Sequence, residues 1–226
     1  MASVKVFGLP ASTEVARVLT CLFEKDVEFQ LIRMDSYKGE GHPAPEFIKL
    51  QEPSGQVTYK EGEKKTLLES RDICRHVCEK YFDQGNQLLG SGGLERASVE
   101  MWMQSEAQKF DPPSTDLIFH LAFAPLLCIP FDRNAVMESE KKLARVLDSY
   151  EEKLGESRYL AGDEFTLADL SHLPNSNYLV NKTARGYNLF ARRKNVSRWW
   201  EEISNRPSWK MVTNLHKEHP GALPTS

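Results

Sequence analysis

The 226-residue sequence has little cysteine, no long apolar stretch and no strong excess of charge of either sign. Its four cysteines do not form a disulfide framework in a chain of this length, so we expect reduced thiols. No window approaches the ~18 apolar residues of a membrane span, and the first residues lack the apolar core of a signal peptide. The net charge of −3 argues against wholesale binding of nucleic acid. We therefore expect a cytoplasmic protein that binds neither membrane nor nucleic acid.

Sequence motifs for metal and phosphate binding are also missing. The six histidines are scattered without an HExxH pattern, and no glycine-rich phosphate loop occurs. Cys74 and Cys78 share one face of a predicted helix, but no His or Cys partner lies at zinc-like spacing. Core packing is therefore the favoured role for this pair, and no metal site is predicted.

The first part of the chain alternates between strand and helix patterns. The predicted elements are a strand at 4–7, a helix from about residue 12, a strand at 29–34, a hairpin pairing 56–59 with 66–68, and a helix from residue 70. The order β-α-β followed by a β-hairpin and a helix predicts an α/β domain with a mixed sheet over residues 1–82.

Strand patterns end at a polar and glycine-rich break, residues 83–93, which we interpret as a linker. Residues 94–226 predict an all-helical domain. Within it, the helix that begins near residue 94 is expected to be interrupted at Asp111-Pro112-Pro113. Thr166 and Asp169 have the spacing of a reciprocal N-terminal capping pair.

Two sites at predicted helix N-termini have residues suited to chemistry. Ser12 lies where the first strand meets the first helix, and there its hydroxyl either caps the helix or stabilises an anion such as a thiolate. Glu69 and Ser70 open the last helix of the α/β domain, where they either cap it or bind an ammonium and a carboxylate. The residues alone leave both alternatives open.

A basic stretch near the C-terminus has two interpretations. Residues 182–217 contain nine Lys or Arg and two Glu, with three tryptophans among them. This pattern fits a nucleic-acid surface, but it also fits a solvated helix face whose tryptophans are turned into the core. Because the chain as a whole is acidic, the second interpretation is favoured.

Several motifs taken together resemble the glutathione transferases. In the α/β part they are Ser12, Gly55-Gln56-Val57 and Glu69-Ser70-Arg71. In the helical part, the segments 165–170 (FTLADL) and 198–209 (RWWEEISNRPSW) resemble the plant phi class. The resemblance covers about residues 4–210. It implies a thioredoxin-like N-terminal domain that binds glutathione and a helical C-terminal domain that supplies most of the pocket for an electrophile.

The resemblance also implies roles for individual residues. Ser12 would donate a hydrogen bond to the glutathione sulfur and stabilise the thiolate that attacks the electrophile. The other glutathione contacts would come from His42 at the glycyl carboxylate, Gln56 and Val57 at the peptide, and Glu69 and Ser70 at the γ-glutamyl group. Candidates for the electrophile pocket are Leu9, Phe119, Phe123 and Tyr178.

This chain departs from the family pattern at three positions of one segment. Thr58 stands where the family has a cis-proline after the valine, and Pro43 replaces a lysine. Both departures are expected to weaken glutathione binding. Ser54 replaces an aromatic residue that plugs into the partner subunit, so the homodimer that the resemblance implies is expected to be weakened.

Two function hypotheses follow from these observations. The first is a phi-class transferase that conjugates glutathione to hydrophobic electrophiles, with glutathione peroxidase activity as a second reaction of the same thiolate. The alternative is a non-catalytic carrier of the same fold for flavonoids or hormones. Retention of Ser12, Gln56, Glu69 and Ser70 favours the enzyme, whereas the altered segment 41–58 favours the carrier.

Overall fold

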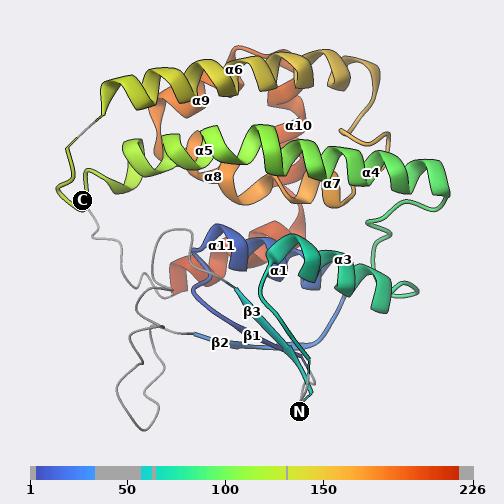
Figure 1. Ribbon diagram of the computed structural model, residues 1–226. Helices are drawn as coiled ribbons and strands as arrows, with labels where there is room; N and C mark the ends of the chain where they lie inside the picture. The colour runs from blue at the N-terminus through green and yellow to red at the C-terminus, as the bar shows by residue number, and fades with distance from the viewer. Residues whose placement is uncertain (1–3, 34–56, 63–64, 131, 219–226) are drawn as a thin grey trace, which may run out of the picture. The chain divides into compact units, whose positions relative to one another are not determined.

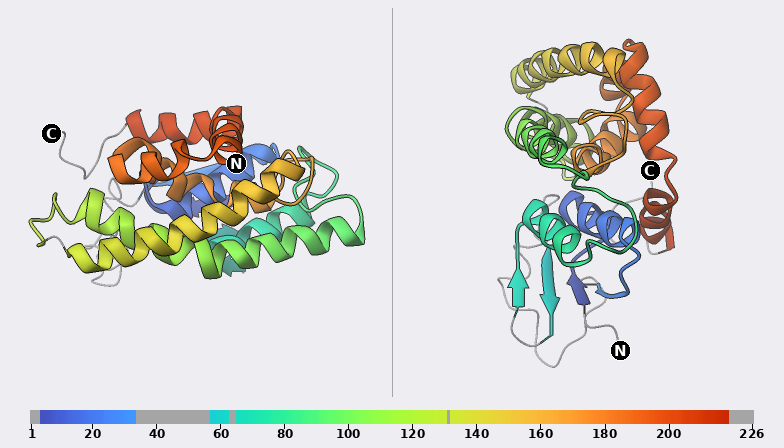
Figure 2. Two further views of the ribbon diagram at one scale, coloured as in Figure 1. Left: turned by 90° about the horizontal axis from the view of Figure 1, so that it is seen from above. Right: turned by 90° about the vertical axis from the view of Figure 1, so that its right-hand side faces the viewer.

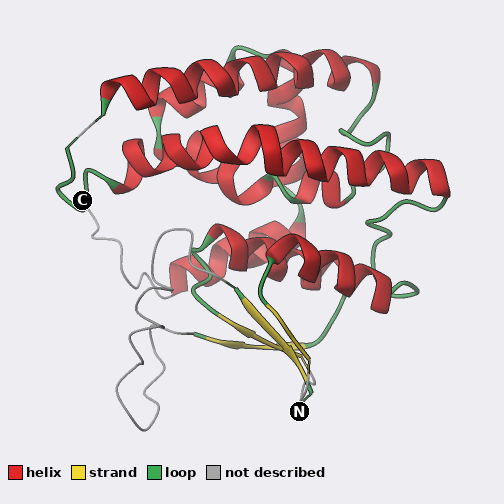
Figure 3. Cartoon of the chain, viewed as in Figure 1, coloured by secondary structure: helices red, strands yellow, loops and turns green. Residues whose placement is uncertain are grey.

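The computed structural model describes residues 4–33, 57–62, 65–130 and 132–218 (Figure 1). The chain divides into two compact units. The first contains the described residues up to Gln87 together with residues 207–218, and the second contains the described residues from Leu88 to Arg206. Figure 3 shows that strands occur in the first unit and that the described part of the second is helical.

The first unit is built on a four-stranded mixed sheet, which confirms the predicted fold class. Its strands are β1 (Val4–Phe7), β2 (Phe29–Ile32), β3 (Thr58–Glu61) and β4 (Lys65–Leu67). They lie in the order β2-β1-β3-β4, with β1 parallel to β2 and antiparallel to β3, and with β3 antiparallel to β4. The β3–β4 hairpin is the one that the sequence predicts.

Three helices complete this unit: α1 (Thr13–Glu24), α3 (Ser70–Lys80) and α11 (Pro207–Glu218). Helix α1 is central, because α3 and α11 both pack against it. Its apolar residues at i, i+3 and i+4 spacing are fully buried, as the periodicity predicts.

Every secondary-structure element in the described part of the second unit is a helix, as predicted. In chain order they are α4 (Gly93–Ser105), η1 (Glu106–Phe110), α5 (Asp111–Ile118), η2 (Phe119–Phe123), α6 (Arg133–Glu156), α7 (Leu167–Leu170), α8 (Leu173–Lys182), α9 (Ala184–Ala191) and α10 (Lys194–Ser204). Figure 2 shows the long helix α6 running beside the α4–α5 run. None of the helices in the described ranges combines the length and the apolar character that crossing a membrane requires.

The expected interruption at Pro112-Pro113 is wrong. The backbone stays helical from α4 into α5, and the change occurs instead in η1, a π-helical turn. There the amide of Asp111 donates to the carbonyl of Glu106, five residues back. The two prolines follow at the start of α5, where the wider turn has already displaced the regular hydrogen-bond ladder that proline would otherwise disrupt.

Asp169 organises the centre of the helical unit. The predicted capping pair is present, with the carboxylate of Asp169 accepting from the Thr166 amide at 3.1 Å. The same carboxylate accepts from the Leu160 amide at 3.0 Å and from Nε1 of Trp199 at 2.9 Å. Burial nevertheless raises the pKa of Asp169 to about 6, because these donors offset only part of the lost hydration.

Helix α11 belongs to the unit that contains the sheet. The sequence assigns all residues from 94 onward to the helical domain, whereas α11 packs on α1. Ser208 of α11 donates to Oε1 of Glu24 at 2.5 Å, and Nη1 of Arg33 donates to the carbonyl of Leu215 at 3.4 Å. The boundaries at residues 82 and 94 themselves stay a prediction.

Candidate functional site

The loop between β1 and α1 is a tight turn that ends at Ser12. The amide of Ser12 donates to the Leu9 carbonyl at 2.9 Å, and the Ser12 carbonyl accepts from the Ala16 amide at 2.9 Å. Ser12 is therefore the N-cap residue of α1, yet its side chain makes no capping hydrogen bond to the amides of that helix. The residue is 7% exposed. Of the two alternatives for Ser12, the geometry does not support capping by the hydroxyl.

At the N-terminus of α3, in contrast, a side chain does cap the helix. The carboxylate of Glu69 accepts from the Asp72 amide at 2.8 Å and so caps the helix. Glu69 is exposed, and Nη1 of Arg71 lies 3.5 Å from its Oε1. Capping leaves the second carboxylate oxygen of Glu69 at the surface, beside the guanidinium of Arg71, whose side chain is only 12% exposed.

A buried arginine links the two helix N-termini. Nη1 of Arg17, on α1, donates to Oγ of Ser70 at 2.8 Å, and both residues are almost completely buried. Glu14, also on α1, accepts a hydrogen bond from the Val57 amide. Burial raises the pKa of Glu14, and the positive charge of Arg17 opposes that shift.

Glu14 and Arg17 are candidate site residues that the sequence did not indicate. Their positions on α1 are typical of ordinary surface charges, because acidic residues are common in the first turn of a helix. One feature of the sequence could have indicated these residues. Arg17 lies between the core positions Val15 and Val18, on a helix whose neighbouring residues are apolar. A charged side chain there requires a buried partner, and Ser70 supplies it.

Val57 is fully buried and lies immediately before β3. Its neighbour Thr58 pairs with Phe7 in the sheet. The Val57–Thr58 peptide bond is trans, since no cis bond occurs among the described residues. His42 and Gln56, and the departures at Pro43 and Ser54, lie outside the described residues.

Three predicted pocket residues belong to the helical unit. Phe123, at the end of η2, and Tyr178, on α8, have ring centroids 5.4 Å apart, and Phe119 opens η2. The phenylalanines are partly exposed, while burial raises the pKa of Tyr178 to about 12. Leu9, the fourth candidate, is in the turn before Ser12 in the other unit.

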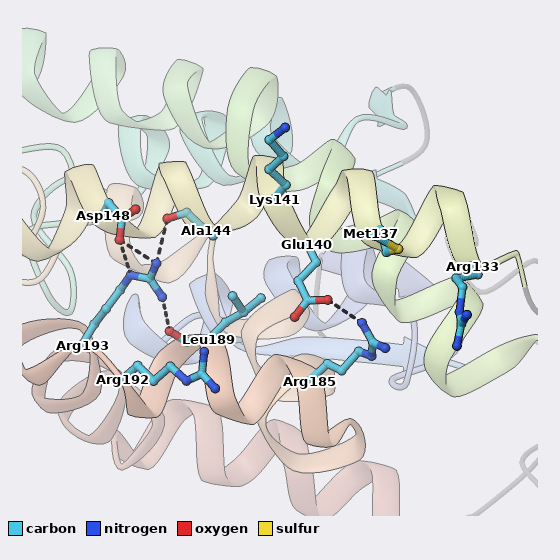
Figure 4. A pocket seen from close by; sticks show the side chains of 10 residues that line it. All are labelled: Arg133, Met137, Glu140, Lys141, Ala144, Asp148, Arg185, Leu189, Arg192 and Arg193. Carbon is cyan, nitrogen blue, oxygen red and sulfur yellow. Dashed lines mark hydrogen bonds and ion pairs between the residues drawn. The ribbon is translucent and has the colours of Figure 1, made fainter.

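A basic groove of about 830 Å³ lies between α6 and α9 (Figure 4). Two ion pairs cross it: Arg185 binds Glu140 at 2.6 Å, and Arg193 binds Asp148 at 2.6 Å. Arg193 also donates to the Leu189 and Ala144 carbonyls. None of the predicted site residues lines this groove, and its two crossing pairs hold α6 to α9 and to the turn between α9 and α10.

No group of three or more His, Cys, Asp or Glu side chains within the described ranges is arranged to hold a metal ion. Cys21, Cys74 and Cys78 are buried together between α1 and α3, with the sulfurs of Cys21 and Cys78 3.7 Å apart. Burial and the neighbouring thiols raise the pKa of Cys21 well above its usual value. A protonated, buried thiol is a poor nucleophile and a poor metal ligand.

Comparison with known proteins identifies the family. Residues 2–79 match the model of the glutathione S-transferase N-terminal domain, and residues 114–207 match that of the C-terminal domain. The chain is 45% identical over 207 residues to glutathione S-transferase F9 of Arabidopsis thaliana, a match that covers 91% of this chain and 94% of that protein. The chain belongs to the glutathione S-transferase family.

Solved structures of glutathione transferases have the same fold. The crystal structure of glutathione transferase F2 from Populus trichocarpa is 55% identical, with a TM-score of 0.85 and coverage of 96% of this chain and 100% of that one. Maize glutathione S-transferase I in complex with an atrazine glutathione conjugate is 30% identical, with a TM-score of 0.81 and coverage of 98% and 100%. The relatives are plant F-type enzymes, which confirms the predicted phi-class resemblance. These matches do not favour the carrier alternative.

Proposed function

We propose that this glutathione S-transferase conjugates reduced glutathione to hydrophobic electrophiles and that Ser12 stabilises the reacting thiolate. The observation that carries the proposal is the position of the Ser12 hydroxyl at the N-terminus of α1, where it does not cap the helix. The homologous maize enzyme, in complex with a glutathione conjugate, supports this substrate class.

The proposed chemistry needs a glutathione sulfur beside Ser12. A cysteine thiol has a pKa near ~8.5, so only a small fraction is ionised at neutral pH. A hydrogen bond from the hydroxyl and the positive end of α1 both stabilise the anion, and together they lower that pKa. The thiolate then attacks an electrophilic carbon and expels its leaving group. Attack on a peroxide oxygen by the same thiolate would give the peroxidase reaction.

The remaining polar groups of the first unit suit the other parts of glutathione. The γ-glutamyl group carries one ammonium and one carboxylate, which fit the exposed Glu69 carboxylate and the adjacent Arg71 guanidinium. Val57 would pair its backbone with the cysteinyl unit as a short added strand. Because its amide already donates to Glu14, we propose that glutathione uses the Val57 carbonyl. Ser70, His42 and Gln56 remain proposed contacts.

The hydrophobic electrophile would be taken up by the predicted pocket residues. Phe123 and Tyr178 support this role, because they form one aromatic pair at the end of a π-helical turn. We propose Phe119 and Leu9 as further lining. The partly exposed phenylalanine rings offer apolar surface that a planar aromatic substrate would cover.

We further propose a cytoplasmic homodimer. Each unit has large apolar side chains at its surface, which supports association: Leu68 is 56% exposed in the first unit, and Met101 is 57% exposed in the second. With Ser54 in place of the aromatic plug, the dimer would be weakened. Sedimentation velocity over a concentration series measures its dissociation constant, and a monomer at all concentrations contradicts this proposal.

The decisive experiment compares Ser12→Ala with Thr13→Ala, which removes the neighbouring hydroxyl. With chlorodinitrobenzene as electrophile, Ser12→Ala should lower kcat about 10–100-fold. Thr13→Ala should change kcat less than about twofold. Because the Ser12 hydroxyl does not cap α1, Ser12→Ala should leave the free energy of unfolding nearly unchanged.

The proposal is overturned if Ser12→Ala loses stability but keeps its turnover. If Ser12 were only a cap, its alanine variant would lose about 1 kcal/mol of stability and keep its turnover. If the wild-type protein neither binds glutathione in calorimetry nor turns over, the carrier hypothesis replaces the enzyme. Titration with a flavonoid would then measure that function directly.

A further inference from the structure

We propose that the basic groove between α6 and α9 is a second binding site, for a small molecule that carries several phosphate groups. The groove belongs entirely to the helical unit, and its residues come from α6, α9 and the turn after α9. None of them is a proposed glutathione contact. The inference therefore goes beyond the proposed function and does not depend on it.

The groove has the size and the charge of an anion-binding site. Its volume of about 830 Å³ falls within the ~300–1,000 Å³ that is typical of small-molecule sites. Seven of its ten lining residues are charged, five of them cationic and two acidic, in a chain whose own net charge is −3. Positive charge is thus concentrated here in a protein that is acidic as a whole, which favours a highly charged anion over a hydrophobic ligand.

Two ion pairs hold the two sides of the groove in one register. Glu140 binds Arg185 at 2.6 Å. Eight residues further along both sides, Asp148 binds Arg193, also at 2.6 Å. On α6 this spacing corresponds to a rise of about 12 Å. The pairs therefore fix the groove over a length that matches an extended small molecule.

The arginines of the pairs differ in how many donors the protein itself uses. Arg193 donates to Asp148 and to two backbone carbonyls, and its side chain is 12% exposed. Arg185 donates from Nη1 to Glu140, and its side chain is 45% exposed. A guanidinium has five N–H donors, so Arg185 retains most of its donors for a ligand, whereas Arg193 is structural.

Two further arginines have no internal partner. Arg133 and Arg192 are exposed, and neither side chain forms an ion pair or a hydrogen bond with any residue that the structure describes. Figure 4 shows these two arginines on either side of the Glu140–Arg185 pair, whereas Lys141 points away from α9. A ligand that lies along the groove would therefore meet Arg192, Arg185 and Arg133 in turn.

This row of guanidiniums favours an extended anion with several charged groups. Arg185 and Arg192 are seven residues apart, nearly two helical turns or about 10 Å along the backbone. Guanidinium N–H groups match the oxygens of phosphate, and each phosphate ester carries up to about two negative charges. A chain of phosphate groups supplies both the charge and the length, whether it comes from a free polyphosphate or from a lipid headgroup with several phosphates.

Calorimetric titration of the full chain with inorganic tripolyphosphate at low ionic strength tests the site. Arg133→Gln and Arg192→Gln each remove one unpaired guanidinium. Lys141→Gln is the matched control, because it removes the same charge from α6 while its side chain points away from α9. All three positions are exposed, so the variants should fold, and thermal unfolding verifies this.

We expect one tripolyphosphate to bind per chain. Its dissociation constant should rise about 5–10-fold in each arginine variant and less than about twofold in Lys141→Gln. Inorganic monophosphate should bind at least about tenfold more weakly than tripolyphosphate, because it reaches fewer guanidiniums.

Vesicles that contain a bisphosphorylated inositol lipid distinguish the two sources of phosphate. Sedimentation of the protein with these vesicles, lost in Arg192→Gln, would identify the lipid headgroup as the ligand. Tripolyphosphate binding without vesicle binding would identify a free polyphosphate. Either result supports the site.

Three results overturn the inference. The first is no binding at about 1 mM tripolyphosphate. The second is an equal loss of affinity in Lys141→Gln, which would show attraction by net charge alone. The third is tighter binding of a single-stranded oligonucleotide with the same dependence on Arg133 and Arg192, which would assign the groove to nucleic acid. Because turnover with chlorodinitrobenzene is measured separately, failure of the Ser12 proposal leaves this inference standing, and the reverse also holds.

Discussion

Nη1 of Arg17 lies 2.8 Å from Oγ of Ser70, so one buried guanidinium joins the N-terminal halves of α1 and α3. The two residues are 53 positions apart in the chain. The same arginine opposes the raised pKa of Glu14. One side chain therefore contributes both to the packing of the two helices and to the charge balance next to Ser12.

Removal of this arginine should destabilise the protein more than removal of its partner. Arg17→Met leaves Ser70 and Glu14 without a buried cation, and we expect a loss of about 2–4 kcal/mol in the free energy of unfolding. Ser70→Ala removes one hydrogen bond and should cost about 1–2 kcal/mol. Urea denaturation measures both. Equal losses would show that the guanidinium acts only through Ser70.

The titration of Asp169 should give stability a characteristic pH dependence. Its pKa in the folded state is about 6, compared with 3.8 as the ordinary value. The folded state therefore binds the proton more tightly, and the stability from this group is complete below about pH 4 and falls as the pH rises to about 6.

Asp169→Asn removes this titration and is the matched control. The difference in free energy of unfolding, wild type minus Asp169→Asn, should fall between pH 4 and pH 6 and stay level above it. Chemical denaturation at several pH values measures the difference. A difference that rises across this interval would mean that the hydrogen bonds from Leu160, Thr166 and Trp199 outweigh the cost of burying the carboxylate.

The four cysteines should react in two classes. Cys128 is exposed, while Cys21, Cys74 and Cys78 are buried in the first unit. In the native protein we expect Ellman's reagent to label Cys128 within minutes and the other three only after denaturation. Cys128→Ser should abolish the fast phase. Rapid labelling of a second thiol would show that α1 and α3 separate readily.

The arginine between α6 and α9 should stabilise the helical unit. Arg193 donates to Asp148 and to two backbone carbonyls with one side chain. Arg193→Ala should lower the free energy of unfolding by about 2–3 kcal/mol, because the carbonyls lose a charged donor. Arg192→Ala, the neighbouring arginine of the same groove, is the control and should change it by less than about 0.5 kcal/mol. Thermal unfolding of both variants compares the two effects.

Periodicity and capping patterns predicted most of the fold because they act over a few residues. The heptad-like spacing of α1, the β3–β4 hairpin and the Thr166–Asp169 pair are all encoded locally. The interruption predicted at Pro112 is wrong because a π-helical turn ahead of it changes the hydrogen-bond register, and no residue type encodes such a turn.

The candidate site was predicted in part. Ser12 and Glu69 were found because both lie at helix starts, which have a sequence signature. Sequence alone could not show that Glu69 caps its helix while Ser12 does not. Arg17 was missed because its partner, Ser70, is distant in the chain, and only the packing of α3 on α1 brings the two together.

The return of α11 to the first unit has a consequence for biosynthesis. The ribosome releases the sheet, α1 and α3 long before residues 207–218 have been made. During that interval the face of α1 on which α11 packs is exposed, and Glu24 lacks the hydroxyl of Ser208. The first unit to be translated is thus the last to be completed, and a nascent chain stalled before residue 207 would present an apolar surface to chaperones.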